Sequence, residues 1–513
     1  MTDRNPLFEL EIQPVVTGAR GASHSLHRQL KAAILDGRLK AGTQLPPGRL
    51  SGACFGVSRN TIAEVYGRLV ADGLAVGRHG SGTYVVARVP AASRGRPPGA
   101  RSTATHRLNS FWLRPEVTTA LGFWNEAAER DGSSRHSARA DFRPAMIDSK
   151  LFPFDTLRVV MAKQLRGLEK KPAGRKSAQG NQGNFYLREA ITTHIALTRS
   201  VVCETEDIIV TSGAQQAFDL LARVLVTPNR TVVAMEDPGY PPMRVAFAAA
   251  GAKVVPIGVD AEGLMVETLT EDVDIICVCP SHQFPLGLTM SKRRRRALIE
   301  YATRRGAVIV EDDYDGEFRF EGYSLEALRA ARHADVVFYI GTFSKCMLPA
   351  LRLGFIVAPK WAMASLIAAK NCLDWHSPTL IQRAVAKFIT DGHLQRHVRR
   401  MRRTYAERRQ LLLAGLLGGF GKWLRPIPSF YGMHVAAVAP APLDLEGISR
   451  RAQAKGVMVH TLSRYYLGPE TQLGLIFGYG VTDIAEIKYG LSVLRQLLLA
   501  PPGRRPTRAS DSR

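Results

Sequence analysis

Apolar positions in the first part of the chain recur at helical spacing. A run of them over residues 24–37 predicts an amphipathic helix that ends at Gly37. Similar patterns predict a second helix over 49–55 and a third over 59–72, with Ser58 as the N-cap of the third. The apolar positions of the first helix are Leu26, Leu30, Ala33 and Ile34.

Two short strand patterns, at 74–76 and 83–86, follow the third helix and are separated by glycines. Three helices and a glycine-tipped hairpin predict a winged helix-turn-helix over residues 20–88. In such a domain the start of the third helix meets base edges and phosphates of DNA. The residues at that position are Arg59, Asn60 and Thr61.

Strand-like and helical patterns alternate from residue 141 to residue 498. This alternation predicts an α/β domain with a mostly parallel sheet. The clearest strands are expected at 208–211, 308–310 and 336–340, and a helix over 216–225 is expected after the first of them.

The stretch between these two regions, residues 89–140, is rich in Pro, Ala, Ser, Arg and Gly, which predicts a flexible linker. The polar and basic residues 499–513 are expected to form a disordered tail. Large side chains within the linker are expected to dock a short piece of it: Trp112, Leu113, Phe123 and Trp124.

The amino-acid composition indicates an anionic binding partner. With 513 residues the chain is too long for one core, and its formal net charge of +24 favours an anionic partner, most often nucleic acid, although a basic surface can also serve only solubility. No apolar run is long enough for a membrane span, and the first ten residues lack the pattern of a secretory signal. Six cysteines without metal-ligand spacing predict reduced thiols, no metal site and a cytoplasmic protein.

Residues suited to binding a cofactor follow three predicted strands of the large domain. A small-residue turn at 212–215 leads into a helix, so its backbone N–H groups can bind a phosphate. The adjacent carboxylates Glu311 and Asp312 would repel each other if both were buried, and a protonated pyridine nitrogen would relieve this. Lys345 can form a Schiff base with an aldehyde, and Arg352 can pair with a phosphate. Taken singly, each of these features is more often only a charged residue in a solvated loop. Together they indicate a site for pyridoxal 5'-phosphate.

The N-terminal region resembles the DNA-binding domain of the GntR family in the order and spacing of four segments: 38–42, 45–49, 56–61 and 80–85. Gly48 stands where the family usually has Ser, and Ala41 where it usually has Pro. The resemblance implies a double-stranded DNA operator as partner. It also implies DNA contacts at Arg49, Ser58, Arg59, Asn60, Thr61 and Gly80.

The large domain carries further motifs that resemble the MocR type of GntR regulator: 212–216, 237–240, 280–287, 311–318 and 341–354. The resemblance covers about residues 20–495, apart from the linker. It implies a winged helix fused to a type I aminotransferase fold, in which a smaller C-terminal α+β part follows the mostly parallel sheet. It further implies a homodimer that binds pyridoxal 5'-phosphate and a small amine or amino-acid effector.

The same resemblance implies a role for each cofactor residue. Lys345 would form the Schiff base, Asp312 would pair with the pyridine nitrogen, and Tyr314 would hydrogen-bond the phenolic oxygen. Tyr240 would stack on the ring. The residues implied to hold the phosphate are Ala214, Gln215, Thr342, Ser344 and Arg352.

Two departures from the family pattern affect the substrate pocket. Ala178 replaces a tyrosine that is usually lent across the dimer to the phosphate. The last strand carries Ile476 where aminotransferases place an arginine for the substrate carboxylate, and Arg464 is the nearest substitute. We therefore favour a regulator that senses the cofactor or a bound amine. A working aminotransferase with a DNA-binding appendage, and a regulator whose large domain only dimerises, are the alternatives.

Two arginine-rich helical segments, 292–296 and 396–409, are expected to be solvated faces. Contact with DNA is the alternative for both.

Overall fold

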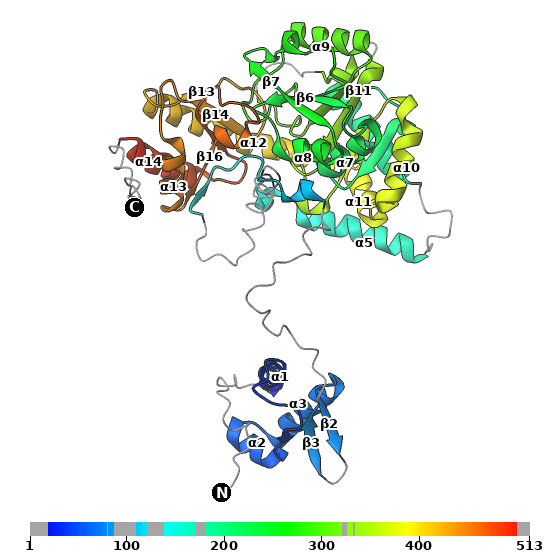
Figure 1. Ribbon diagram of the computed structural model, residues 1–513, viewed down its shortest axis with the longest axis vertical. Helices are drawn as coiled ribbons and strands as arrows, with labels where there is room; N and C mark the ends of the chain where they lie inside the picture. Colours follow the sequence, from blue (N-terminus) through cyan, green and yellow to red (C-terminus); the bar gives the residue numbers. More distant parts are fainter. Residues whose placement is uncertain are drawn as a thin grey trace, which may run out of the picture. The chain divides into compact units, whose positions relative to one another are not determined.

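The computed structural model describes residues 19–78, 81–86, 109–115, 117, 120, 138–170, 180–320, 326–331 and 334–499. The chain divides into two compact units, residues 1–108 and 109–513, and each is described by itself (Figure 1). Several positions considered above lie outside the described residues: Gly80, Phe123, Trp124, Ala178 and 500–513.

The first unit is the expected winged helix. Its elements are α1 (Ala19–Leu35), β1 (Gln44–Leu45), α2 (Gly48–Phe55), α3 (Arg59–Ala71), β2 (Ala75–Arg78) and β3 (Gly82–Val85). The strands form an antiparallel sheet in the order β1-β3-β2. Three of these strands exist where two were predicted, because β1 has only two residues and offers no alternating pattern.

The turn between α2 and α3 requires small residues. A side chain at Gly52 would bring its Cβ to 2.8 Å from the backbone oxygen of Val57, and Gly56 ends α2 in the left-handed region at φ 66°. Ser58 then begins α3, since its side chain accepts a hydrogen bond from the Thr61 backbone N–H at 3.1 Å. This local geometry fixes where α3 starts.

The second unit is built on an eight-stranded sheet in the order β5-β12-β11-β10-β9-β6-β7-β8. The pairs among β11, β10, β9, β6 and β7 are parallel, whereas β12 runs antiparallel to both its neighbours and β8 antiparallel to β7. The strands are β5 (Ile208–Thr211), β6 (Val232–Asp237), β7 (Lys253–Asp260), β8 (Gly263–Leu264), β9 (Ile275–Val278), β10 (Val308–Asp313), β11 (Val337–Thr342) and β12 (Gly354–Val357).

Helices cover both faces of this sheet, as Figure 1 shows. On one face Phe218 and Met243 pack with Val310 in a buried cluster, and on the other Leu298 packs with Ile309. The helices of the first face are α7 (Ala214–Leu225), α8 (Pro241–Ala249) and α10 (Met363–Asp374). Those that contribute to the other clusters are α5 (Phe154–Lys170), α6 (Phe185–Arg199), α9 (Lys292–Arg305) and α11 (Thr379–Thr390).

A smaller antiparallel sheet follows, in the order β13-β14-β17-β16, and confirms the expected C-terminal α+β part. Its strands are β13 (Arg425–Pro426), β14 (His434–Val438), β16 (His460–Thr461) and β17 (Gly474–Gly478), and β15 (Val457–Met458) pairs separately with β4 (Ala140–Asp141). The accompanying helices are α12 (His393–Gly419), α13 (Leu445–Gln453) and α14 (Ile484–Leu499). No helix among the described residues is both long and apolar enough to cross a membrane.

The interpretation of the two arginine-rich segments as solvated faces is wrong for several of their residues. Arg294 in α9 is buried and ion-paired with Asp260 at 2.7 Å and with Glu267 at 2.9 Å. Arg408 in α12 is buried and paired with Asp148 at 2.7 Å. The acidic partners come from distant parts of the chain, so the local pattern could not reveal them.

A short piece within the predicted linker stretch packs on the second unit, though not through Trp112 or Leu113. Asn109 caps a 3-10 helix, η3 (Ser110–Leu113), by accepting a hydrogen bond from the Phe111 N–H at 3.0 Å. Phe111 and Val117 are buried, whereas Trp112 and Leu113 are 52% and 55% exposed.

Candidate cofactor and DNA-binding sites

Lys345 and Asp312 belong to neighbouring parallel strands and their following loops. Asp312 lies opposite Ile340 in the β10–β11 register, and Lys345 follows β11. The Lys345 Nζ donates a hydrogen bond to the Ala145 carbonyl oxygen at 2.7 Å. Burial lowers the pKa of Lys345 to about 8, against the opposing effect of the Asp315 and Asp312 carboxylates. A neutral amine, the form that attacks an aldehyde, is therefore accessible near neutral pH.

Asp312 is a buried carboxyl with spare hydrogen-bonding capacity. Burial, together with the Asp313 and Asp315 carboxylates, raises its pKa to about 8, and Lys345 opposes the shift. Its Oδ1 has no hydrogen-bond partner among the described residues, while the Cys279 thiol lies 4.0 Å from Oδ2. A cationic ring nitrogen would satisfy both the charge and the free oxygen.

The two carboxylates on either side of Asp312 are bound to other partners. The Glu311 carboxylate accepts hydrogen bonds from the N–H groups of Leu328 (2.8 Å) and Arg329 (3.0 Å). Asp313 accepts from the Tyr339 hydroxyl at 2.6 Å. The physical reason is that β10 continues through Asp313, so that successive side chains point to opposite faces.

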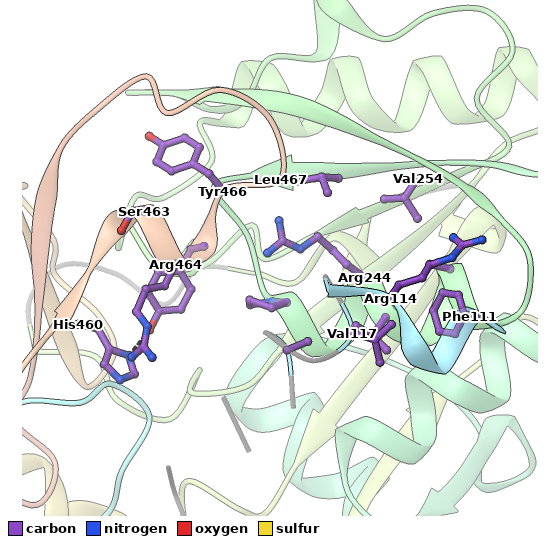
Figure 2. Close-up of a pocket in the computed structure, with 15 residues that line it drawn as sticks. Phe111, Arg114, Val117, Arg244, Val254, His460, Ser463, Arg464, Tyr466 and Leu467 are labelled. Atoms are coloured by element: carbon purple, nitrogen blue, oxygen red, sulfur yellow. Dashed lines mark hydrogen bonds between the residues drawn. The ribbon is translucent and has the colours of Figure 1, made fainter. Parts of the chain in front are cut away.

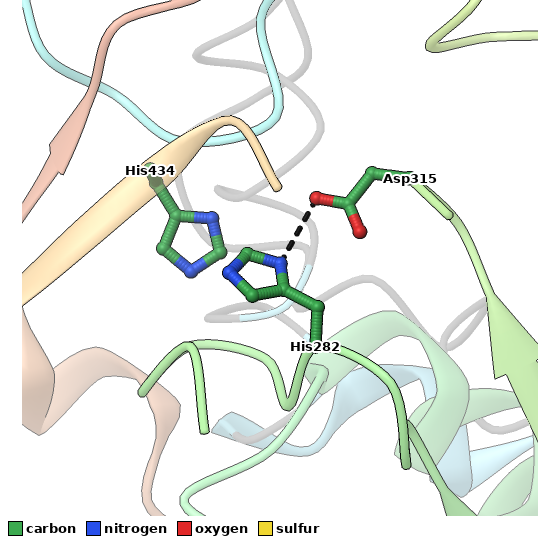
Figure 3. Close-up of side chains that lie close together, drawn as sticks. All are labelled: His282, Asp315 and His434. Atoms are coloured by element: carbon green, nitrogen blue, oxygen red, sulfur yellow. Dashed lines mark hydrogen bonds and ion pairs between the residues drawn. The ribbon is translucent and has the colours of Figure 1, made fainter. Parts of the chain in front are cut away.

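Tyr314 belongs to a buried hydrogen-bonded group that the sequence did not reveal. Its hydroxyl donates to the His282 carbonyl oxygen at 3.1 Å and lies 2.8 Å from His282 Nδ1. The same nitrogen lies 3.0 Å from Asp315 Oδ2, and the His434 ring packs 4.6 Å from the His282 ring (Figure 3). This arrangement fixes the position of the Tyr314 hydroxyl.

His282, Asp315 and His434 also offer ligand atoms within 4.8 Å of one another, a donor set that zinc accepts. Hydrogen bonds satisfy part of the group without a metal, because His434 Nε2 lies 2.9 Å from the Pro285 carbonyl oxygen and Asp315 pairs with His282. His282 Nε2 and His434 Nδ1 have no hydrogen-bond partner among the described residues. Burial and the His282 ring hold the pKa of His434 well below its usual range. The three residues come from two loops and from the start of β14. His282 and Asp315 lie in motifs that the sequence had shown, and His434 does not.

The candidate phosphate residues converge around the start of α7. Gly213 is the N-cap of α7 at φ 86°, and Ala214 and Gln215 form its first turn. Arg352 donates from Nη2 to the Ser212 carbonyl oxygen at 2.8 Å. A Cβ at Gly213 would lie 3.0 Å from this guanidinium, so the glycine lets Arg352 lie against the turn.

Thr342 and Ser344 approach the same place from β11. The Thr342 hydroxyl donates to the Ser344 hydroxyl at 3.0 Å. Gly354 lies between the two loops, because its Cβ would be 3.0 Å from both the Gly213 Cα and the Gly341 oxygen. The turn at the start of α7 and the end of β11 therefore lie side by side.

Tyr240 precedes α8 beside this group. Its ring packs edge-on against Phe284 at 5.6 Å between centroids, and burial raises its pKa. The Gln215 side chain donates to the Pro242 carbonyl oxygen at 3.3 Å, which joins the starts of α7 and α8.

Arg464 lies elsewhere. It is exposed on η12 (Leu462–Tyr465) and lines a pocket of about 430 Å³ together with Arg244 and Arg114 (Figure 2). Of the described residues that line this pocket, none is Lys345 or another of the candidate phosphate residues.

In the winged helix, Arg49, Arg59 and Asn60 are exposed near the starts of α2 and α3. A Cβ at Gly48 would lie 3.6 Å from the Arg59 Cγ, so the starts of the two helices are adjacent. Thr61 is half-buried, and its hydroxyl is 2.8 Å from that of Ser58. Ser58 and Thr61 thus cap the helix, and the two arginines extend beyond it.

Comparisons with known proteins agree with this architecture. The family model "Bacterial regulatory proteins, gntR family" matches residues 22–85, and the model "Aminotransferase class I and II" matches residues 148–440. The probable rhizopine catabolism regulatory protein MocR of Rhizobium meliloti is 35% identical over 94% of this chain and 95% of its own length. The HTH-type transcriptional regulator TauR of Rhodobacter capsulatus is 31% identical over 94% and 97%.

Among solved structures, an archaeal alanine:glyoxylate aminotransferase is similar at a TM-score of 0.68, with 25% identity over 77% of this chain and 98% of its own. The α-aminoadipate aminotransferase LysN of Thermus thermophilus is similar at a TM-score of 0.63, with 28% identity over 73% and 98%.

The fold and the matches define a class in which a DNA-binding winged helix is joined to a domain of the aminotransferase class I and II family, a pyridoxal-phosphate-dependent fold family. The chain belongs to the GntR family of bacterial regulators, in its MocR-type group, and is a transcriptional regulator rather than simply an aminotransferase with an appendage. The resemblance stated from the sequence motifs is confirmed.

Proposed function

We propose that the large domain binds pyridoxal 5'-phosphate through Lys345 and that the regulator senses the cofactor or a small amine or amino acid bound to it. The observation that carries this proposal is the pairing of a buried, readily neutral amine at Lys345 with a buried carboxyl at Asp312. The two groups are close enough to shift each other's pKa in opposite directions. That combination suits a cofactor that presents an aldehyde and a basic ring nitrogen.

The other residues fit the rest of the cofactor. Asp312 would hold a proton on the ring nitrogen, and Tyr314, positioned by His282, would bind the phenolic oxygen. Tyr240 would cover the ring. The phosphate would be held by the first N–H groups of α7, at Ala214 and Gln215, and by Thr342, Ser344 and Arg352. When bound, the cofactor supplies the electrophilic carbon that traps an amine.

We also propose that the regulator is a homodimer. Apolar side chains along α5 and at the start of α6 are unusually exposed for a globular domain, and burial in a second copy would remove them from water. These side chains are Phe154, Val159, Leu165, Phe185 and Tyr186.

The residues available to hold a substrate carboxylate at the proposed cofactor site favour sensing of a ligand over catalytic turnover. Fast transamination needs a clamp that fixes the substrate carboxylate, and a bidentate arginine is the usual device. Ile476, at the corresponding place on β17, is fully buried among apolar residues and cannot serve. Arg464 is the remaining candidate for the effector carboxylate, but it is exposed and lines the pocket of Figure 2, which includes neither Lys345 nor the candidate phosphate residues. It therefore does not form an enclosed clamp beside Lys345.

The test is an absorbance titration of the purified protein with amines and amino acids. We expect a visible band that borohydride reduction fixes to the protein, that shifts with one class of amine, and that is absent in Lys345→Ala. A reducible adduct retained by Lys345→Ala would overturn the assignment. Conversion of an amino acid and a keto acid at ordinary enzyme rates, ~1–1000 per second, would overturn the sensing proposal.

A further inference from the structure

The pocket in Figure 2 lies outside the proposed cofactor site and combines buried charge with apolar walls. It is formed by α8, by β7, by η12 with the residues that follow it, and by the described residues of the segment 109–120. Its volume of about 430 Å³ is in the range of small-molecule sites.

Arg244 is a largely buried cation of this pocket. Its side chain is 12% exposed, and its nearest described carboxylate is that of Asp237, with 3.9 Å between Nη1 and Oδ1. The Asp237 carboxylate is already bound at short range, since it accepts hydrogen bonds from the N–H groups of Leu467 (2.7 Å) and Gly468 (2.9 Å). Nη1 of Arg244 makes no hydrogen bond with the described residues. A buried guanidinium in this state is costly unless an anion pairs with it.

The walls around Arg244 are mainly apolar. Val245 and Val254 come from the α/β core, and Phe111 and Val117 come from the segment 109–120. Arg114 stacks its guanidinium over the Phe111 ring at 5.3 Å, and Arg464 lines the pocket from η12. Figure 2 shows Arg244 projecting between the η12 loop and the segment that carries Val117.

We propose that this pocket binds a small organic carboxylate with an apolar body. The carboxylate pairs with the Arg244 guanidinium, whose planar fork matches it, and the apolar part packs against Phe111 and Val117. This ligand needs no amine and no contact with Lys345, so the site goes beyond the proposed cofactor chemistry.

Such a ligand would act on the segment 109–120, because Phe111 and Val117 form one wall of its site. Binding to the docked segment stabilises the docked form by linkage. In the sequence this segment follows directly on the residues that lead from the winged helix. Ligand binding in this pocket would therefore hold the segment 109–120, the end of the connection from the DNA-binding unit, more firmly against the second unit.

The test uses phenylacetate as probe and phenylacetamide as its neutral control, with the full chain and saturation-transfer NMR. We expect phenylacetate to bind the wild type at least about tenfold more tightly than phenylacetamide, and Arg244→Gln to lose that difference, since a charge-assisted hydrogen-bond pair is worth ~1.5–3 kcal/mol. Arg223→Gln, on the exposed side of α7 where Arg223 pairs with Asp219, is the matched control and should bind as the wild type does. Equal binding of the two compounds, or unchanged binding by Arg244→Gln, would refute the proposal.

A second measurement covers the case in which Arg244→Gln does not fold. Hydrogen exchange in the wild type should slow across residues 109–117 when phenylacetate is added and not when phenylacetamide is added. Exchange that is unaffected by phenylacetate would refute the coupling to this segment. Lys345→Ala should bind phenylacetate as the wild type does, so loss of the visible band with retained phenylacetate binding separates this site from the cofactor site.

Discussion

At the residue scale, the chemistry depends on two buried groups whose charged forms burial disfavours. Lys345 is easily neutral because burial disfavours its ammonium form, and Asp312 is easily protonated because burial disfavours its carboxylate. In the cofactor-free protein this arrangement costs stability. A cofactor with a ring nitrogen that can be protonated would recover part of that cost by pairing with Asp312.

The pH dependence of stability tests this description of Asp312. Its carboxyl has a pKa of about 8 in the folded protein, against ~4 when unfolded, so the folded state keeps a proton that the unfolded state has lost. Stability should therefore fall as pH rises from 6 to 8 in protein stripped of cofactor with hydroxylamine. Asp312→Asn cannot ionise, and the difference in unfolding free energy between variant and wild type should grow in the variant's favour by on the order of 2 kcal/mol over this interval.

Denaturant unfolding at several pH values gives the measurement. Glu236, Glu311 and Lys345 also have shifted pKa values, at about 8, about 6 and about 8. All three remain in the variant, so their contributions cancel apart from the part of the Glu236 and Lys345 shifts that Asp312 causes. Parallel pH profiles for the two proteins would show that Asp312 does not titrate in this range.

At the element scale, the start of α3 sets how the winged helix can meet DNA. Gly52 and Gly56 permit the tight turn, Ser58 caps the helix, and Arg59 is the first helical residue. The capping roles of Ser58 and Thr61 make the exposed Arg49 and Arg59 the stronger candidates for DNA contact.

We expect Arg59→Ala to weaken DNA binding on the order of tenfold and to reduce the salt dependence of binding by about one counterion. The DNA is a duplex that the full-length protein selects from a random library, and affinity is measured by fluorescence anisotropy at several salt concentrations. Arg68→Ala is the matched control, because Arg68 lies further along α3 and pairs with Glu64 at 2.7 Å. An equal loss in both variants would mean that general charge, and not the start of α3, sets affinity.

At the scale of the whole molecule, the two units have separate cores. The winged helix buries its own cluster around Leu30 and Ile62, and the second unit buries its clusters on the sheet. Packing within each core does not depend on residues of the other, so we expect each unit to fold by itself.

Removal of residues 1–108 should leave the visible band, its borohydride reduction and its response to amines unchanged, while specific DNA binding is lost. Absorbance spectroscopy and anisotropy on the truncated protein check both parts. If the band disappeared in the truncated protein, the cofactor site would depend on the first unit, against the division into separate cores.

The local pattern of the chain by itself determined the helices and hairpin of the winged helix, the strand β5 and the position of Lys345 after β11. These features depend on neighbours within a few residues: apolar spacing, Ser58 as a cap, and glycines at turns. The order of the motifs also determined the family, because the spacing of turn and strand-end residues can be recognised along the sequence without the structure.

Only the tertiary structure decided which groups meet. Glu311 and Asp312 point to opposite faces because β10 extends through Asp313, and the His282–Asp315–His434 group joins two loops and the start of β14. The burial of Arg294 depends on carboxylates at 260 and 267, and the pocket that Phe111 lines is formed with α8 and η12. Burial and charge pairing are properties of neighbours in space, and for these residues the neighbours are far away in the sequence.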